Sequence, residues 1–545
     1  MSEKEKQDIS AAHYEEAEPN VLEEGKPKWK ANNQLDDAAR ILAEAGHHEF
    51  DAADKKRVLR KIDLYVCIPM CIMYLCQQLD KSSMGYAAVF DLQTATHLHG
   101  TQYSWLTSVV YLAQFFTQPL SAYALIAFPV KWWILFNFAA WSITTICTAA
   151  ATNFIGLLMA RLFLGIFEAT ILPSFIFITQ MWYTRREHAY RTTAYQFANS
   201  MAAIIGPLVT YGVGHASTAH IRAYQAIFIT IGLISLAFVP VVYFLLPSSP
   251  TTAPFLNSGN DRLIALERIR ENQTGTKSSK WKWNQCREAF CDPKTYMWGL
   301  MYFLMSAPTG GLGSFGALII KGLGFSSFTA ILMQMPTGVL GMVCMVFWTW
   351  VVNKIKLRWP VVTFSLVFPI IGAALLTQYT SANIPQMMFG YYVIFVATVP
   401  QIMYSWANIN ASGSTKRVVT TAIMFCCMCC GNIIGPQVYL AREAPHYHTG
   451  LYFAMGCWAL HSIVGALMAV YLKALNRKQE ARRVALGLPA KLKDISIMDM
   501  DEADAYRAEL FQQLREAGGI DSDALYANSF EDMTDFENPM FIYVL

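Results

Sequence analysis

Long apolar runs recur along the whole chain and are separated by shorter polar stretches. A helix that crosses about 30 Å of hydrocarbon needs about 20 mostly apolar residues, and these runs reach that length. Membrane-spanning strands fit the pattern less well, because they cover only about 10 residues and alternate apolar with polar positions. We therefore predict an all-α polytopic membrane protein with twelve transmembrane helices. The predicted spans are 62–87, 102–122, 132–150, 155–180, 192–214, 224–246, 296–320, 326–351, 360–378, 386–408, 418–440 and 450–473.

One long polar stretch divides the predicted helices into two groups of six. The groups resemble each other weakly, because the motif Ile-Ile-Gly-Pro at 204–207 in the fifth helix recurs at 433–436 in the eleventh. Repeated six-helix halves form the major facilitator fold, whose substrate site lies between the halves near the membrane midplane. We expect five parts: a disordered cytoplasmic N-terminal tail (1–60), a six-helix bundle (61–247), a cytoplasmic central loop (248–295), a second six-helix bundle (296–474) and a cytoplasmic acidic C-terminal tail (475–545).

The composition narrows the class of protein further. Hydrophobic residues make up 54% of the chain and charged residues 15%, whereas soluble domains average about 25% charged residues. The mean hydropathy is +0.29. These values exclude a disordered chain, a coiled coil and an ordinary soluble enzyme. The net charge is +3 without a basic stripe, so no nucleic-acid partner is expected, and the acidic ends are expected to be solvated, mobile tails.

The distribution of basic residues predicts the orientation in the membrane. The polar N-terminal stretch lacks the apolar core of a signal peptide, which indicates a cytoplasmic N-terminus. Short cytoplasmic loops are enriched in Lys and Arg. If the N-terminus is cytoplasmic, the basic residues of the cytoplasmic loops are Lys131, Arg185, Arg186, Arg191, Lys354, Lys356, Arg358, Lys416 and Arg417. Those of the outer loops are only Arg222, Lys321 and Arg442. The asymmetry predicts an even number of helices and both termini in the cytoplasm.

Several kinds of chemistry are not expected. The cysteines at 426, 427, 429 and 430 lie inside an apolar run without a neighbouring histidine or loop, so we interpret them as packing residues and predict no metal site. The sequence has no G-x-x-x-x-G-K-[ST] loop, which argues against ATP-driven pumping. No Ser-His-Asp or zinc-helix pattern is present, and we predict neither an enzyme nor a cofactor.

Four ionisable residues interrupt the apolar runs and are the main functional candidates. Asp80 and Lys81 lie late in the first predicted helix, and Arg161 and Glu168 share one face of the fourth, roughly 10 Å apart along its axis. A charge within hydrocarbon is costly, so such residues are functional candidates by default. A cation can hold a small organic anion, and a carboxylate beside it can take up a proton. We therefore assign proton coupling to Asp80 and Glu168 and substrate binding to Lys81 and Arg161.

A structural interpretation competes with this one. The four charges could form an ion-pair cluster that joins the first and fourth helices. Other polar residues inside predicted helices can line a water-filled path or bridge helices, and the candidates for the cavity are Gln196, Asn199, Gln401 and Asn432. The Pro- and Gly-rich stretch 308–313 is expected to loosen the seventh helix, as a gating or close-approach segment.

The motifs resemble those of a known family. Asp80-Lys81 in the first helix, with Arg161, Gly165 and Glu168 in the fourth, resembles the anion:cation symporter branch of the major facilitator superfamily. Over roughly residues 60–480 the chain is similar to the fungal allantoate permease family. The segments that carry this likeness are Asp80–Phe90, Gln102–Trp105, Met181–Glu187, Glu267–Gly275, Lys280–Trp283 and Asp292–Thr295.

The resemblance implies proton-driven uptake of a small organic anion across the fungal plasma membrane. Allantoate, ureidosuccinate and vitamin carboxylates are among the substrates of the family. It further implies that Asp80 and Glu168 handle protons, and that Lys81 and Arg161 serve the substrate carboxylate or its coupling. Lys81 stands where bacterial and animal members have an arginine, so the two-bonded grip of a guanidinium is missing there.

Three other functions remain open at this point. An exporter of a secondary metabolite or drug is the first, although the chain lacks the Gly pair that follows Gly-Pro in many drug antiporters. A nutrient-sensing transceptor that signals through its tails is the second. An intramembrane enzyme is the third, and the absence of a nucleophile–base or metal pattern argues against it.

Overall fold

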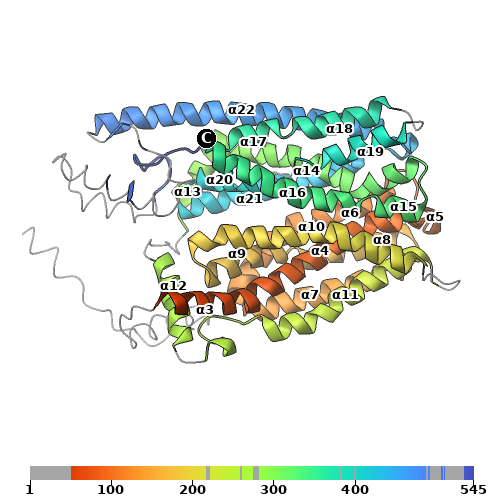
Figure 1. Ribbon diagram of the computed structural model, residues 1–545, viewed down its shortest axis with the longest axis horizontal. Coiled ribbons are helices and arrows are strands. Elements are labelled where there is room, and N and C mark those ends of the chain that lie inside the picture. The colour runs from red at the N-terminus through yellow and green to blue at the C-terminus, as the bar shows by residue number, and fades with distance from the viewer. Residues whose placement is uncertain are drawn as a thin grey trace, which may run out of the picture. The chain divides into compact units, whose positions relative to one another are not determined.

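The computed structural model describes residues 51–215, 221–257, 260–273, 281–379, 383–397, 400–486 and 533–545, with single positions at 489, 490, 492, 505, 506 and 509. Across these residues the chain is helical and contains no strand, so the predicted all-α fold is confirmed. The described helices belong to one unit, residues 48–545, and run alongside one another (Figure 1). The predicted N-terminal tail lies outside the described residues as far as residue 50.

The first half contains six helical runs, joined by short turns. They are α3 (Ala52–Ile62), η1 (Asp63–Cys67) and α4 (Ile68–Val89) in one run; α6 (Gln102–Ala127); α7 (Val130–Thr148); α8 (Phe154–Glu168) with α9 (Ile171–Trp182); α10 (Arg185–His215); and α11 (Ala223–Leu245). A one-turn helix, α5 (Leu92–Ala95), follows the first run. The region between the halves contains η2 (Pro254–Leu256), α12 (Asp261–Gln273) and α13 (Trp283–Cys291).

The second half repeats this arrangement. Its runs are α14 (Pro293–Gly322); α15 (Ser327–Leu332) with α16 (Met335–Ile355); α17 (Trp359–Phe364) with α18 (Val367–Gln378); α19 (Ile384–Ile394) and α20 (Pro400–Ile409); α21 (Ser414–Gln437), followed by η3 (Ala441–Glu443); and α22 (His448–Ala485). Among the described residues, 8 helices are long and apolar enough to cross a membrane by length and composition alone. The runs correspond in number and order to the predicted spans.

The first and last helices are longer than the sequence pattern predicts. α3 begins at Ala52, inside the stretch that was expected to be a disordered tail, and Val58 on this helix is fully buried. Asp261 on α12 binds Arg57 at 2.9 Å and Lys61 at 2.6 Å. The expected boundary at residue 60 is therefore wrong for residues 52–60, because packing against α12 keeps this polar segment helical. α22 likewise continues beyond the predicted limit of the second bundle, to Ala485.

The helix bundle has two distinct ends. We call the end that carries α3, α12, α13 and residues 533–545 the tail end, and the opposite end, with α5 and α15, the loop end (Figure 1). At the loop end one apolar core contains residues of both halves, including Met84 and Phe315. Towards the tail end the halves have separate cores, one around Trp182 and one around Trp406.

Hydrogen bonds between the halves lie near the loop end. The Tyr103 hydroxyl donates to the Ser314 carbonyl at 2.8 Å, and the Lys321 ammonium donates to the Val89 carbonyl at 2.7 Å. The backbones also come close, since a Cβ added to Gly85 would lie 3.1 Å from the carbonyl oxygen of Gly313. The two halves are therefore closed on each other at the loop end.

The Pro- and Gly-rich stretch of the seventh run does not interrupt the helix. α14 continues through Pro308, and the glycines allow α21 to approach closely. A Cβ added to Gly310 would lie 2.9 Å from the Asn432 side-chain oxygen, and one added to Gly311 would lie 2.3 Å from the Tyr439 ring. The expected loosening is absent here, and the close-approach interpretation is the one that agrees with the structure.

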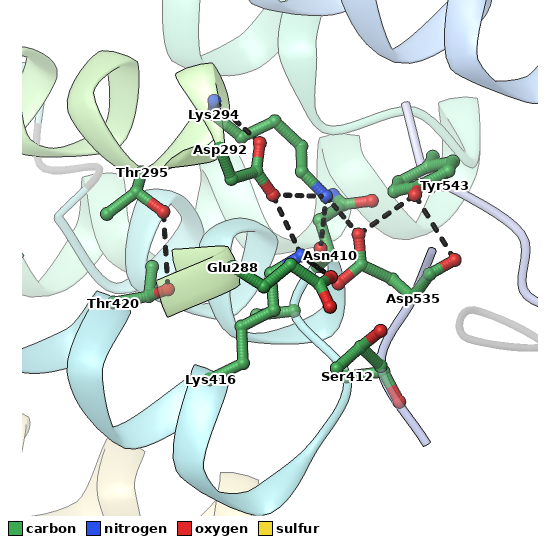
Figure 2. A network of polar contacts seen from close by, with 12 residues as sticks. Glu288, Asp292, Lys294, Thr295, Asn410, Ser412, Lys416, Thr420, Asp535 and Tyr543 are labelled. Atoms are coloured by element: carbon green, nitrogen blue, oxygen red, sulfur yellow. Dashed lines mark hydrogen bonds and ion pairs between the residues drawn. The ribbon is translucent and has the colours of Figure 1, made fainter. Parts of the chain in front are cut away.

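The end of the chain is packed rather than solvated. Within residues 533–545, Thr534 and Asp535 are fully buried and Tyr543 is 1% exposed. The expectation of a mobile tail is therefore wrong for these residues, because they are tied to the tail end of the second half by ion pairs and hydrogen bonds (Figure 2).

Candidate functional site

Glu168 lies at a break in the fourth helical run. α8 ends at Glu168, and α9 begins at Ile171 with Pro173 in its first turn. Proline has no N–H, so the carbonyl of Ala169, four residues earlier, loses its helical hydrogen-bond partner. Pro173 therefore explains the break, which places the carboxylate at a helix end in the middle of the Phe154–Trp182 span.

Glu168 forms an ion pair with Lys81 on α4. The distance from Lys81 Nζ to Glu168 Oε1 is 3.1 Å, and Gln114 Nε2 on α6 donates to Glu168 Oε2 at 3.1 Å. The Glu168 side chain is only 2% exposed, whereas that of Lys81 is 26% exposed. The Lys81 ammonium also lies 5.8 Å from the Tyr111 ring centroid. The carboxylate is thus buried behind a cation that solvent can reach.

Lys81 lies on α4, which packs against α14 of the second half. Cys429 on α21, in the second half, lies near both Lys81 and Tyr111. In the first half, Tyr74 lies near the same ammonium and near the side chain of Gln196. Groups from α4, α6 and α21 therefore lie near Lys81, as expected of a site between two halves.

Asp80 points away from this group, although it precedes Lys81 in the chain. Successive residues on a helix are rotated by about 100°. The Asp80 carboxylate turns towards α7, where Trp141 Nε1 and Thr145 Oγ1 both donate to Oδ2, the latter at 2.7 Å. Asp80 is 1% exposed, and its Oδ1 has no hydrogen-bond partner. Asp80 is therefore held by α7, whereas Lys81 pairs with Glu168 on α8.

Arg161 is buried and interacts electrostatically with Asp80 more strongly than with Glu168. It is 3% exposed, its Nη2 donates to Met84 Sδ at 3.4 Å, and its guanidinium lies 5.1 Å from the Phe228 ring centroid. Its Nε has no hydrogen-bond partner. The opposite charges of Asp80 and Arg161 attract each other, although no ion pair between them is present in the described part of the chain. The structure thus separates the four predicted residues into an open pair, Lys81–Glu168, and an enclosed pair, Asp80 and Arg161.

The four polar residues predicted for the cavity have different surroundings. Gln196 lies near Tyr74 at the site. Asn432 is 7% exposed and donates to the carbonyl of Met428 on its own helix at 3.0 Å, where it packs against α14. The Gln401 side-chain oxygen has no hydrogen-bond partner, and Asn199 is half-buried on α10.

Sequence reasoning missed Trp141 and Thr145, which hold Asp80 in place. They are four residues apart on α7 and so share one face. Trp and Thr are common in membrane helices, and nothing local marks them as partners of a carboxylate. In the part of the chain that the structure describes, no group of three His, Cys, Asp or Glu side chains could hold a metal ion.

A separate hollow of about 470 Å³ lies at the tail end, between η1 and α10. Its lining includes Arg60 and Tyr190, together with Arg191, which binds Asp63 through two hydrogen bonds of 3.0 and 2.7 Å. None of the predicted site residues lines this hollow. The chemistry of Lys81 and Glu168 makes the junction of the halves the stronger candidate site.

Comparisons with known proteins agree with this arrangement. A family model described as Major Facilitator Superfamily matches residues 70–436. The chain is 33% identical over 464 residues to "Uncharacterized transporter C460.05" of Schizosaccharomyces pombe, with 84% of this chain and 86% of that protein covered. It is 26% identical over 538 residues to the allantoate permease of Saccharomyces cerevisiae, with 94% and 91% covered. The inward-open structure of the E. coli xylose transporter XylE has a TM-score of 0.58 at 13% identity, and the match covers 73% of this chain and 94% of that one.

Proposed function

The chain belongs to the Major Facilitator Superfamily and is a membrane transporter rather than an enzyme, and from this premise we propose that it carries a small organic anion together with a proton. The observation that supports this most is the ion pair between Lys81 and Glu168, 3.1 Å apart. One member of the pair is buried, and the other is partly exposed and lies near the second half. This geometry offers an anion a binding partner and a proton an acceptor at one place.

The proton and the anion would act on the same pair. While Glu168 is ionised, it occupies the Lys81 ammonium, with Gln114 as its second partner. A proton on Glu168 removes the negative charge and frees the ammonium for the carboxylate of the substrate. The freed ammonium, which is 26% exposed, then offers its charge to the substrate carboxylate. Anion binding and protonation therefore promote each other.

The enclosed pair would support this site without contacting substrate. Asp80 joins α4 to α7 through Trp141 and Thr145, and the Arg161 guanidinium on α8 attracts the Asp80 carboxylate. Because Asp80 is adjacent to Lys81 on the helix, these contacts fix the rotation of α4 about its axis. We infer that Asp80 and Arg161 hold Lys81 towards Glu168, whereas Lys81 binds the substrate.

The relatives support a substrate that carries a carboxylate. The match to the allantoate permease of Saccharomyces cerevisiae covers 94% of this chain, and allantoate is an organic anion. We infer import across the plasma membrane of a fungus, with both termini in the cytoplasm. The loop end, which is closed in the structure, would then face the outside, and substrate would leave from the tail end.

Uptake by a yeast strain that lacks the corresponding permeases tests this proposal. The panel contains labelled allantoate, ureidosuccinate, nicotinate, pantothenate, biotin and a dipeptide, each offered at acidic and at neutral pH. We expect one compound to accumulate more strongly at acidic pH, and Glu168→Gln to abolish accumulation. Asp51→Asn is the matched control, because Asp51 is exposed at the start of α3 and its side chain makes no capping hydrogen bond, and it should behave as the wild type.

A second assay separates proton coupling from substrate binding. In counterflow no net proton movement is needed, so Glu168→Gln should still exchange labelled for unlabelled substrate, whereas Lys81→Gln should not. Accumulation that is unaffected by Glu168→Gln would overturn the coupling role. If loaded cells extrude a compound and take up no compound of the panel, the protein is an exporter rather than an importer.

A further inference from the structure

The segment 533–545 occupies a defined place at the tail end of the second half. It follows the end of α22 by more than forty residues, yet Asp535 is fully buried and Val544 is 4% exposed. Closing a loop becomes only slowly more costly as the loop lengthens, so a tether of this length does not prevent docking. The contacts that hold the segment are ionic at one end and made through the backbone at the other.

Asp535 is the charged anchor of the segment (Figure 2). Its carboxylate binds Lys294 on α14 and Lys416 on α21, with 2.7 Å between Lys416 Nζ and Asp535 Oδ1. The Tyr543 hydroxyl donates to the same carboxylate at 2.8 Å. Both ammonium groups also bind Asp292, at 3.3 and 2.9 Å.

The fully buried charges pair one to one when Asp535 is present. Lys294, Lys416 and Asp292 are all at most 3% exposed, so two buried cations would otherwise share one fully buried anion. Glu288 binds Lys416 at 2.8 Å, but its side chain is 22% exposed, so water screens it more strongly. Buried charges are tolerated when they are paired, and Asp535 completes the second pair.

Two asparagines bind the backbone of the segment reciprocally. Asn410 accepts from the N–H of Val544 at 2.8 Å and donates to its carbonyl at 3.0 Å. Asn476 on α22 does the same for Tyr543, at 2.9 and 2.7 Å. Trp406 Nε1 on α20 also donates to the Val544 carbonyl, at 2.8 Å. The segment therefore joins α20 and α22 in addition to α14 and α21.

The helices that Asp535 joins are those that meet the first half. α14 packs against α4, and α21 packs against α6, so both must change their contacts when the halves rock. α22 packs against α14 and α18 within the second half. A link from α14 and α21 to α22 would make the tail end of this half move as one body.

We propose that residues 533–545 form a strap, an intramolecular clamp that braces the tail ends of α14 and α21 against α22 through Asp535. The strap is a component of the second half rather than part of a solvated tail. Its removal loosens the ends of α14 and α21 and leaves the loop end unchanged.

Cleavage of the full-length protein tests whether the strap binds on its own contacts. A site for a specific protease is inserted between residues 519 and 520, and the purified protein is cut in detergent and passed over a size-exclusion column. We expect the strap fragment to stay with the helices in the wild type and to be lost at least tenfold more completely from Asp535→Asn. Glu537→Gln is the matched control, because Glu537 is exposed and its carboxylate accepts from the N–H of Thr534; it should retain the fragment.

A milder variant and a second measurement cover the case in which Asp535→Asn does not fold. Tyr543→Phe removes only the hydroxyl that donates to Asp535, and we expect partial release of the fragment. Hydrogen exchange is then compared before and after the fragment is lost. Amides at 293–300 and 414–420 should exchange at least several-fold faster, whereas those at 310–320 should not change. A fragment that leaves the wild type on cleavage, or exchange that is unaltered at the tail end, would overturn the proposal.

Discussion

Removal of the Lys81 ammonium is the most direct perturbation of the proposed site. Lys81→Met leaves the Glu168 carboxylate, which is 2% exposed, with Gln114 as its remaining partner. Loss of one partner of a buried pair typically costs about 3–5 kcal/mol. Lys81 is itself 26% exposed, and the Gln114 hydrogen bond remains. We therefore expect Lys81→Met to lower the unfolding free energy by about 3 kcal/mol, the lower limit of this range.

A double-mutant cycle isolates the interaction of the pair. Glu168→Gln alone leaves a lysine that water can reach, so we expect the unfolding free energy to fall by about 1 kcal/mol. With both changes present, no unpaired buried carboxylate remains. The double variant should therefore also lose about 1 kcal/mol of unfolding free energy, instead of the roughly 4 kcal/mol expected if the two single losses added. The difference is a coupling free energy of about 3 kcal/mol, the upper limit for residues in contact.

The assay is reversible unfolding in mixed micelles at neutral pH, with SDS as denaturant and tryptophan fluorescence as the signal. Lys473→Met on α22 is the control, because this lysine is exposed and its replacement should change the unfolding free energy by less than about 0.5 kcal/mol. Additive effects of the two single changes, with a coupling below about 0.5 kcal/mol, would refute the view that the buried carboxylate depends on this lysine.

Two further predictions concern the packing of α14 against α21 and the strap. A Cβ added to Gly435 would lie 2.0 Å from the Ala307 carbonyl oxygen, so Gly435→Ala should lower the unfolding free energy by about 1–3 kcal/mol. Gly456→Ala, which meets no atom within 4 Å, should be neutral or stabilising by up to about 1 kcal/mol; equal losses in the SDS titration would contradict the packing argument. Burial alone would raise the pKa of Asp535, but the two lysine ammonium groups outweigh it and hold that pKa below its usual value. A lowered carboxyl pKa stabilises the docked state above the undocked value, about 3.9, and this contribution disappears as the pH falls through the docked value. The cleaved strap should therefore stay bound at about pH 5–8 and detach only below about pH 4; release between pH 5 and 7 on the size-exclusion column is the contrary result.

The helical runs could be read from the sequence because membrane insertion depends on a local property. A stretch of about 20 apolar residues satisfies its backbone within one helix wherever its neighbours lie. The same pattern misplaced the limits of the first and last helices. α3 begins at Ala52 because Asp261, far away in the chain, binds Arg57 and Lys61, and no local pattern contains that contact.

The candidate site was predictable as a set of residues but not as a set of pairs. Asp80, Lys81, Arg161 and Glu168 stand out because charges are rare in apolar runs. The sequence placed Arg161 and Glu168 on one face of the fourth helix, yet the structure pairs Glu168 with Lys81 and leaves Arg161 buried without an ion pair in the described part of the chain. The pairing depends on the rotation of α4 about its axis, which the contacts of Asp80 with α7 determine.

The sequence alone therefore determined that this chain is a helical membrane protein with two six-helix halves and ionisable residues in its first half. The tertiary structure decided which charges meet, at which end the halves close, and that Asp535 belongs to the second half. Apolar length and charge are properties of a short stretch, whereas an ion pair such as Lys294 with Asp535 joins residues 241 positions apart. Only the packing of the helices brings such residues together, because the sequence around either residue does not indicate its partner.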